Sequence, residues 1–481
     1  MIFNSIDFVI FLPIVFLLYW FVFNRTIRLQ NAFVVIASYI FYGWWDWKFL
    51  ILIAFTSFFS WGSGLLIGKY NGHKKKQKTI NILNIVVNIL ILCFFKYYNF
   101  FVSSFADAFL GGDTGGMLLN IVLPIGISFY TFQALSYSID VYRGKIEPTK
   151  DIIQFFAFVS FFPQLVAGPI ERASNLLPQF AQKRVFNYAG AVEGCRQILW
   201  GMFKKVVIAD SCASIVDGIF ENYDSLPASV LLLGAFLFSF QIYGDFSGYS
   251  DIAIGVAKLF GIKLMRNFNV PYFSRDIAEF WRRWHISLTT WFRDYVYIPL
   301  GGSRVSKAKI LRNTFVIFLL SGFWHGANWT FIAWGTYHAL LFLPLILTGR
   351  NRKYTDCIAS GKLLPSVREF FQMVITFLFV LVGWIIFRAD TISDACNYVL
   401  NMISFGNFLP LNGEFVEGHT FMAVIFIFIM LVVEWLGRSK SYIFDIDNIR
   451  SKPIRIAIYY VFIIVILLFC GKAQPFIYFQ F

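Results

Sequence analysis

The chain has 481 residues, of which 58% are hydrophobic and only 14% are charged, and 41 Lys and Arg against 27 Asp and Glu give a formal net charge of +14. Soluble domains carry about 25% charged residues, so this composition excludes a water-soluble fold and indicates an integral membrane protein. The Lys and Arg residues are not gathered in a separate basic domain, which argues against nucleic-acid binding. We therefore expect the positive charge to lie on the cytoplasmic face of a membrane. The six cysteines are scattered without a CxxC pair, which excludes a disulfide framework and a cysteine-type zinc site.

Apolar runs follow one another along most of the chain. They lie near 8–23, 31–44, 48–68, 79–101, 117–139, 228–258, 308–324, 328–347, 369–388, 419–436 and 454–471. Each is close to the roughly 20 residues with which a helix crosses a bilayer, and none alternates with period two as a membrane barrel strand does. The sequence therefore predicts an all-α polytopic membrane protein with about 10–12 transmembrane helices, forming a single domain over 1–481.

The charges of the loops predict the orientation. The loop 69–78 carries five lysines, and 349–368 and 437–455 are also basic, whereas 102–116 and 389–418 contain acidic residues and no Lys or Arg. Basic loops stay in the cytoplasm, so both termini are expected outside it. An even number of crossings is then needed between 150 and 348, and 193–220 is the candidate for the fourth, although it contains Lys204 and Lys205.

Two segments are too broken or too polar to span the membrane cleanly. Prolines 163, 169 and 178 interrupt 151–181, which predicts a re-entrant or interfacial helix pair. Taken as one helix, 275–304 places its aromatic residues on one face and Arg282, Arg283 and Arg293 on the other, with His285 on the border. Such a helix lies at the interface or in a groove of the protein.

The chain has five histidines, and three of them fall in embedded segments. His73 and His419 lie in loops, where we expect them to be solvated. His285, His325 and His338 are embedded, and an ionisable residue inside a membrane is by default a functional candidate. His338 lies in an otherwise apolar span and is better explained as a core residue.

His325 lies in the sequence SGFWHGANW. Ser321 precedes it by four residues and Asn328 follows by three, so a continued helix would place all three on one face. Gly322 and Gly326 would let a backbone or a substrate approach closely. Two roles are open for His325: it is either a catalytic histidine or a core histidine that is hydrogen-bonded to a carbonyl.

Other catalytic arrangements find little support in the sequence. There is no GxSxG and no HExxH motif, which argues against a serine hydrolase and a metalloprotease. Asp245 and Asp251 lie six residues apart on different helical faces, which favours a structural role for both. Arg282, Arg283 and Arg293 could hold the phosphates of a donor or contact anionic lipid heads. A buried histidine without a metal suits acyl transfer, in which it takes the proton of an attacking hydroxyl.

Two segments resemble the signature regions of the membrane-bound O-acyltransferase (MBOAT) family, most closely its bacterial alginate O-acetyltransferase-like branch. They are FWRRWHISLTTWFRDYVYIPLGG (280–302) and SGFWHGANWTFIAWGTYHALL (321–341), and 132–148, 161–180 and 241–261 are similar to further segments of that branch. The region of resemblance within 121–347 implies that His325 is catalytic and that His285 is the second, more variable histidine. It also implies a ring of helices around a central tunnel in a bacterial cell membrane.

The resemblance further implies the substrates. The donor would be a cytoplasmic acyl thioester, acetyl-CoA in the first instance, with no bound cofactor and no metal. The acceptor would be a hydroxyl of an extracytoplasmic polysaccharide, or of a periplasmic or extracellular relay protein that passes the acetyl group on. The residues expected to line the substrate path are Trp281, Arg282, Arg283, Trp284, Ser321, Trp324 and Asn328.

Three alternative functions remain at this stage. Within the same family, the chain could transfer D-alanine from a carrier protein to teichoic acid. Outside it, a non-enzymatic transporter of lipid or sugar would move intact substrate without cleaving a thioester. A scaffold of a glycan-export complex would tolerate replacement of both embedded histidines.

Overall fold

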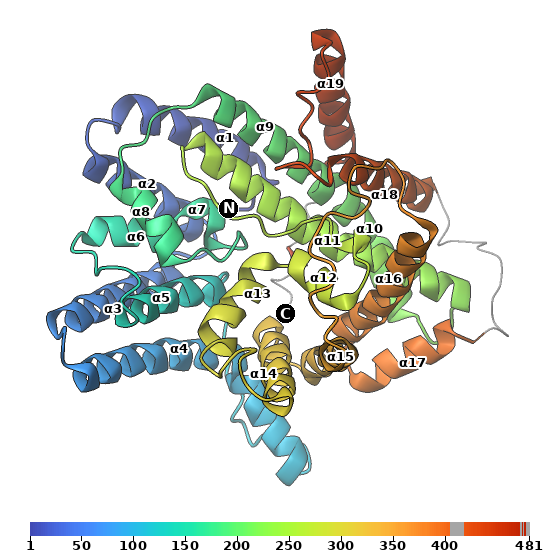
Figure 1. The fold of residues 1–481 in the computed structure, drawn as a ribbon, viewed down its shortest axis with the longest axis horizontal. Coiled ribbons are helices and arrows are strands. Elements are labelled where there is room, and N and C mark those ends of the chain that lie inside the picture. The colour runs from blue at the N-terminus through green and yellow to red at the C-terminus, as the bar shows by residue number, and fades with distance from the viewer. Residues whose placement is uncertain (405–417, 472–473, 475, 478–481) are drawn as a thin grey trace. The chain divides into compact units, whose positions relative to one another are not determined.

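The computed structural model describes residues 1–404, 418–471, 474, 476 and 477, and within these residues every regular element is a helix (Figure 1). This confirms the predicted all-α class. Glu414 and Glu417 of the acidic loop and the side chain of His419 lie outside the described residues.

The chain divides into two compact units. The first unit comprises Met1–Gly194 and Ala253–Met265, and the second comprises Cys195–Ile252 and Arg266–Phe481. The first unit contains α1 (Ile6–Leu17), η1 (Leu18–Val22), α2 (Ile27–Gly43), η2 (Trp47–Phe49), α3 (Leu50–Lys69), α4 (Lys74–Phe109), α5 (Ile127–Tyr142), α6 (Ile152–Ser160), α7 (Phe162–Leu165) and α8 (Ala173–Ala181). Two helices, α9 (Tyr188–Met202) and α11 (Ala228–Leu259), contribute residues to both units.

The second unit contains the segments with the embedded histidines. Its other elements are η3 (Phe203–Ala209), α10 (Asp210–Glu221), η4 (Pro271–Phe273), α12 (Ile277–Arg283), α13 (Ile286–Phe292), η5 (Arg293–Tyr297), α14 (Lys307–His325), α15 (Trp329–Leu347), α16 (Val367–Arg388), α17 (Ile392–Met402), α18 (Gly418–Gly437) and α19 (Lys452–Phe469).

Seven helices in the described part of the chain are long and apolar enough to cross a membrane. They are Trp47–Lys69, Lys74–Phe109, Ala228–Leu259, Trp329–Leu347, Val367–Arg388, Thr420–Gly437 and Lys452–Phe469, and Ile6–Val22 is a shorter apolar helix. The segment 193–220 is helical throughout but is not among the seven. Its Lys204 and Lys205 are buried, and each pairs with an aspartate of α11: Lys204 with Asp251 at 2.6 Å, and Lys205 with Asp245 at 2.7 Å.

Two apolar segments differ from their predicted form. The run at 117–139 is not one helix, because Pro124 precedes a left-handed Gly126 (φ +74°) and α5 begins only at Ile127. A side chain at Gly126 would approach the carbonyl oxygen of Leu165 at 2.6 Å, so the turn requires glycine. The segment 151–181 is broken and largely buried as expected, but it forms the three short helices α6, α7 and α8 instead of a pair.

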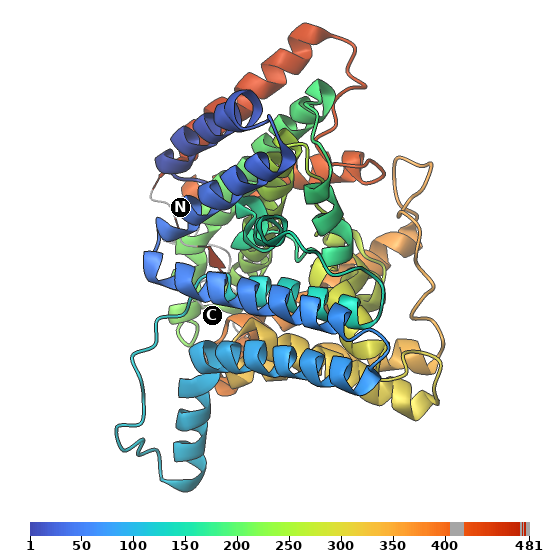
Figure 2. The ribbon, with the colours of Figure 1, turned by 90° about the vertical axis from the view of Figure 1, so that its left-hand side faces the viewer.

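The helices α3, α4 and α5 of the first unit lie next to one another (Figure 2). Polar side chains join them. Asn84 of α4 donates from Nδ2 to the hydroxyl of Ser138 on α5 at 2.8 Å, and its Oδ1 accepts from the hydroxyl of Ser60 on α3 at 3.2 Å. Helices in lipid gain no hydrophobic energy by associating, so small residues and shared hydrogen bonds stabilise their packing.

Helices α14 and α15 pack at very close range. A methyl group added at Gly335 of α15 would lie 2.3 Å from the carbonyl oxygen of Phe318, and one at Gly322 of α14 would lie 2.2 Å from that of Phe331. This reciprocal contact between small residues and backbone fixes the end of α14, where His325 lies.

We expect Gly335→Ala to lower the free energy of unfolding by about 1–3 kcal/mol, because the backbone of α14 must move away. The matched change Gly62→Ala in α3 adds a methyl group with no atom within 4 Å. It should be neutral or slightly stabilising, since alanine is the better helix former. Thermal unfolding of both variants in the same detergent measures the difference, and equal melting temperatures would contradict the packing argument.

Candidate functional site

His325 is the last residue of α14 and is 3% exposed. Its ring meets three aromatic rings nearly edge to face: Trp324 at 5.0 Å, Trp334 at 5.0 Å and Phe387 at 5.4 Å between centroids. Gly326 follows in an extended conformation (φ −162°), and a side chain there would collide with the ring of Phe331. The imidazole is therefore enclosed by aromatic side chains of α14, α15 and α16 and does not face lipid.

His285 lies at a break in the predicted helix 275–304, so the expectation of one continuous helix was wrong. Its backbone is left-handed (φ +43°), and it separates α12 from α13. Two hydrogen bonds from the preceding loop hold the break: Asn269 N–H donates to Arg283 C=O at 2.9 Å, and Ile286 N–H donates to Asn267 C=O at 2.8 Å. Both contacts involve the loop before α12, which lies outside the segment 275–304. The spacing of the aromatic residues within 275–304 therefore could not predict the break.

The two histidines lie next to each other inside the second unit. Their ring centroids are 6.4 Å apart, and Trp324 contacts both rings. His285 is 1% exposed and meets Phe246 of α11 edge to face at 4.7 Å. Burial lowers the pKa of His285, which lies outside the seven candidate spans, so this imidazole is neutral at physiological pH.

His338 is a core residue, as its sequence context predicted. It is fully buried on α15 against Trp281 and Trp334, each with centroids 5.0 Å away. Its Nδ1 accepts a hydrogen bond of 3.4 Å from the indole N–H of Trp281. The closed aromatic surround and the hydrogen bond from Trp281 account for the position of His338, whose Nε2 has no hydrogen-bond partner among the described residues.

The remaining aromatic and polar candidates divide into two groups. Trp281, Trp284, Trp324 and Ser321 are all buried in the second unit, and the ring of Trp284 packs at a tilt against that of Trp384 of α16, with centroids 4.7 Å apart. Asn328 does not continue the helix of His325. Its Oδ1 caps α15 by accepting from Thr330 N–H at 3.1 Å, and its Nδ2 donates to Asp390 C=O at 2.9 Å.

These contacts predict a small, structural effect for Asn328. We expect Asn328→Ala to cost about 1 kcal/mol of stability through the lost helix cap, whereas Asn328→Asp should keep the cap and lose the hydrogen bond to Asp390 C=O. Thermal unfolding of both variants, together with the rate of the acyl transfer predicted from the sequence, tests this. A large loss of rate at unchanged stability would instead assign Asn328 to substrate binding.

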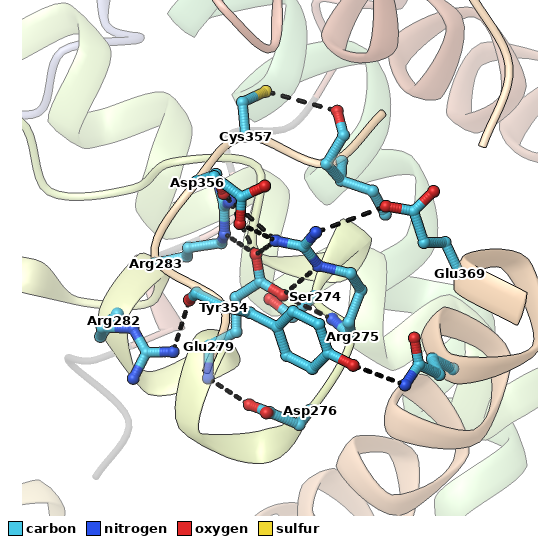
Figure 3. Close-up of polar contacts among 12 residues, drawn as sticks. Ser274, Arg275, Asp276, Glu279, Arg282, Arg283, Tyr354, Asp356, Cys357 and Glu369 are labelled. Atoms are coloured by element: carbon cyan, nitrogen blue, oxygen red, sulfur yellow. Dashed lines mark hydrogen bonds and ion pairs between the residues drawn. The ribbon is translucent and has the colours of Figure 1, made fainter. Parts of the chain in front are cut away.

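Arg282 and Arg283 donate hydrogen bonds to oxygen atoms of the protein itself (Figure 3). The guanidinium of Arg282 donates to Asn351 C=O at 2.8 Å and to Tyr354 C=O at 2.7 Å. Arg283 donates to Glu279 Oε1 at 2.8 Å and to Asp356 C=O at 2.9 Å. Both arginines thus hold the loop at 351–356 against α12, and their binding of donor phosphates stays a prediction.

Glu279 is at the centre of this arrangement and was not identified from the sequence. It is 1% exposed, and its carboxylate accepts from Arg275 and Arg283, which lie four residues before and after it. Arg275 also reaches Asp356, and this hydrogen bond lowers the pKa of the Asp356 carboxyl. The four-residue spacing of Glu279 and Arg283 was the available signal, because such residues face one another on a helix, whereas Arg275 lies just before α12.

Asn267 was also missed, and nothing in its local sequence indicates it. It is fully buried, and its side-chain oxygen lies 3.1 Å from His285 Nδ1. Only the fold of the loop before α12 brings the two together.

The fold and the site define a class of protein: a polytopic helical membrane protein with two neighbouring histidines buried among aromatic side chains. Residues 146–383 match the membrane-bound O-acyltransferase (MBOAT) family. The chain is 43% identical to the probable alginate O-acetylase AlgI of Pseudomonas aeruginosa, over 84% of this chain and 75% of that protein. It is 33% identical to the peptidoglycan O-acetyltransferase of Helicobacter pylori, over 98% and 95% of the two chains.

The chain belongs to the membrane-bound O-acyltransferase family and is an O-acyltransferase, as the two signature segments predicted. It also shows 32% identity to the teichoic acid D-alanyltransferase of Bacillus subtilis, over 56% of this chain and 69% of that protein. Membership of an acyltransferase family excludes the transporter and scaffold alternatives as the principal function.

Proposed function

We propose that this protein transfers an acetyl group from cytoplasmic acetyl-CoA to a hydroxyl of an extracytoplasmic polysaccharide, or of a relay protein that acetylates one. The observation that carries the proposal is the pair of buried imidazoles of His325 and His285, 6.4 Å apart within aromatic side chains. The names of the alginate and peptidoglycan relatives support acetyl as the acyl group and a surface glycan as the final acceptor.

His325 is the general base of the proposed reaction. Its imidazole takes the proton of the acceptor hydroxyl while the oxygen attacks the thioester carbonyl, so that a C–O bond forms and the C–S bond breaks. The proton then passes from His325 to the departing thiolate, which leaves as the free thiol. An imidazole can both accept and return a proton near neutral pH, and the aromatic surround excludes the water that would hydrolyse the thioester.

The remaining candidates have proposed roles around this centre. Trp324 contacts both imidazoles, Trp281 and Trp284 belong to the buried aromatic packing of the same unit, Ser321 lies one helical turn before His325, and Asn328 fixes the start of α15. Arg282 and Arg283 lie on the basic segment that we assign to the cytoplasmic, donor side of a bacterial cell membrane. In this orientation both chain termini are extracytoplasmic, and the acceptor enters from the opposite side to the donor.

D-alanyl transfer is the second candidate, because a teichoic acid D-alanyltransferase is among the relatives. The same histidine chemistry would serve it, since both donors are thioesters. The larger aligned share of the chain with the alginate and peptidoglycan relatives favours acetyl transfer.

Labelled donors distinguish the two candidates. The purified protein in liposomes is supplied with acetyl-labelled acetyl-CoA or with a D-alanyl-loaded carrier protein, and label is followed into alginate, peptidoglycan fragments and teichoic acid. We expect label to move from acetyl-CoA only. Transfer from the D-alanyl carrier alone would overturn the acetyl assignment, and mass analysis of surface glycans from cells lacking the protein gives an independent readout of the acceptor.

A further inference from the structure

Asn267 is held in one orientation by three hydrogen bonds besides that to His285. Its Oδ1 accepts from the backbone N–H of Ser287 at 3.2 Å and from the Ser287 hydroxyl at 2.9 Å. Its Nδ2 donates to the hydroxyl of Ser250 on α11 at 3.1 Å. Because a backbone N–H can only donate, the atom that it meets must be the amide oxygen, and this fixes which way the amide faces.

The orientation of this amide determines the tautomer of His285. The Asn267 oxygen can only accept a hydrogen bond, so His285 Nδ1, 3.1 Å away, must carry the proton. In a neutral imidazole the other nitrogen, Nε2, then carries a lone pair and no proton. Nε2 is buried and has no hydrogen-bond partner among the described residues. A buried acceptor left without a partner is costly, and a bound ligand that donates to Nε2 would satisfy it.

We infer that Asn267 is a positioning residue that holds His285 in the Nδ1–H tautomer, so that Nε2 accepts a hydrogen bond from an O–H or N–H group of a bound substrate. This inference rests on the proposed function, because it describes a role at the same site. It limits what His285 can do. With no proton on Nε2, His285 does not donate to the thioester carbonyl oxygen, but it can orient a hydroxyl or amide or receive a proton.

The backbone supports the same arrangement. His285 adopts a left-handed conformation that is unfavourable for a residue with a Cβ atom, and Asn267 C=O accepts from the N–H of the next residue, Ile286. Asn267 thus contacts the break through both its backbone and its side chain. Strained backbone held by its surroundings is typical of functional sites. The ring of His325, which is also titratable, lies 6.4 Å from that of His285.

Two substitutions of Asn267 separate a tautomer effect from a structural one. Asn267→Leu removes the acceptor oxygen, whereas Asn267→Asp keeps an acceptor at the same place. The tautomer is read directly from the ¹⁵N resonances of histidine-labelled protein in lipid, with His285→Gln used to assign the signal. Asn313→Leu, which changes another fully buried asparagine on α14, is the control and should leave the His285 signal unchanged.

We expect the wild-type protein and Asn267→Asp to show a protonated Nδ1 and an unprotonated Nε2, and Asn267→Leu to show a changed or mixed state. Losing the group that orients a functional imidazole typically costs 10–100-fold in activity, so transfer from labelled acetyl-CoA should fall by about 10–100-fold in Asn267→Leu and clearly less in Asn267→Asp. A protonated Nε2 in the wild type, or an unchanged rate in folded Asn267→Leu, would overturn the inference. Because the NMR measurement needs no substrate, it stands even if the wild-type protein transfers nothing from acetyl-CoA, a result that would contradict the proposed function alone.

Discussion

Replacing His325 with Ala is expected to lower the rate of acetyl transfer by about 10²–10⁴-fold, the usual contribution of a general base. The cause is the loss of the group that takes the proton from the attacking hydroxyl. The rate is measured in proteoliposomes with labelled acetyl-CoA, and in cells as O-acetylation of the surface glycan at matched membrane abundance.

Two further variants make this result interpretable. His325→Gln keeps a polar side chain in the aromatic surround and should be similarly inactive if proton transfer, and not packing, is what His325 supplies. His73→Ala changes an exposed histidine before α4 and should retain the wild-type rate. Near-normal activity of either His325 variant in folded protein would reject the catalytic assignment.

Glu279→Ala is expected to lower the free energy of unfolding by about 3–5 kcal/mol, the largest stability effect that this structure predicts. Removing this buried carboxylate leaves Arg275 and Arg283, both buried, without their shared partner. Glu279 also orients Arg283, which donates to the carbonyl of Asp356, so its loss would weaken the contact between α12 and the loop at 351–356, and α12 ends two residues before His285. Thermal unfolding and the amount of protein in the membrane both report the loss.

The exposed end of the same cluster provides the control. Asp356 pairs with Arg275 at 2.9 Å, but its side chain is 62% exposed, and such a pair typically contributes less than about 1 kcal/mol. Asp356→Ala should therefore change the melting temperature little. In the double variant Glu279→Ala with Arg283→Met, removal of one unpaired charge should recover part of the stability. Equal losses of stability in Glu279→Ala and Asp356→Ala would show that burial does not determine how much these ion pairs contribute to stability.

The two histidines of the candidate site could be predicted because the residues that indicate them lie next to them in the chain. His325 and His285 were identified from their sequence contexts, and the structure places both within one aromatic cluster. His338 was correctly attributed to the core, since an apolar span around a histidine indicates packing. The predicted stacking of Asn328 on the face of His325 was wrong, because α14 ends at His325 and Asn328 caps the next helix instead.

The sequence by itself determined the membrane class, the all-helical fold and the acyltransferase family, because hydropathy, periodicity and signature segments are properties of residues close together in the chain. Only the tertiary structure decided where the helix at 275–304 breaks, which carbonyls of the loop at 351–356 accept from Arg282 and Arg283, and which side chain meets Nδ1 of His285. These features depend on hydrogen bonds with the loops at 267–269 and 351–356, and no local pattern in the chain specifies them. Such contacts form only when the folded backbone brings distant donors and acceptors within bonding distance.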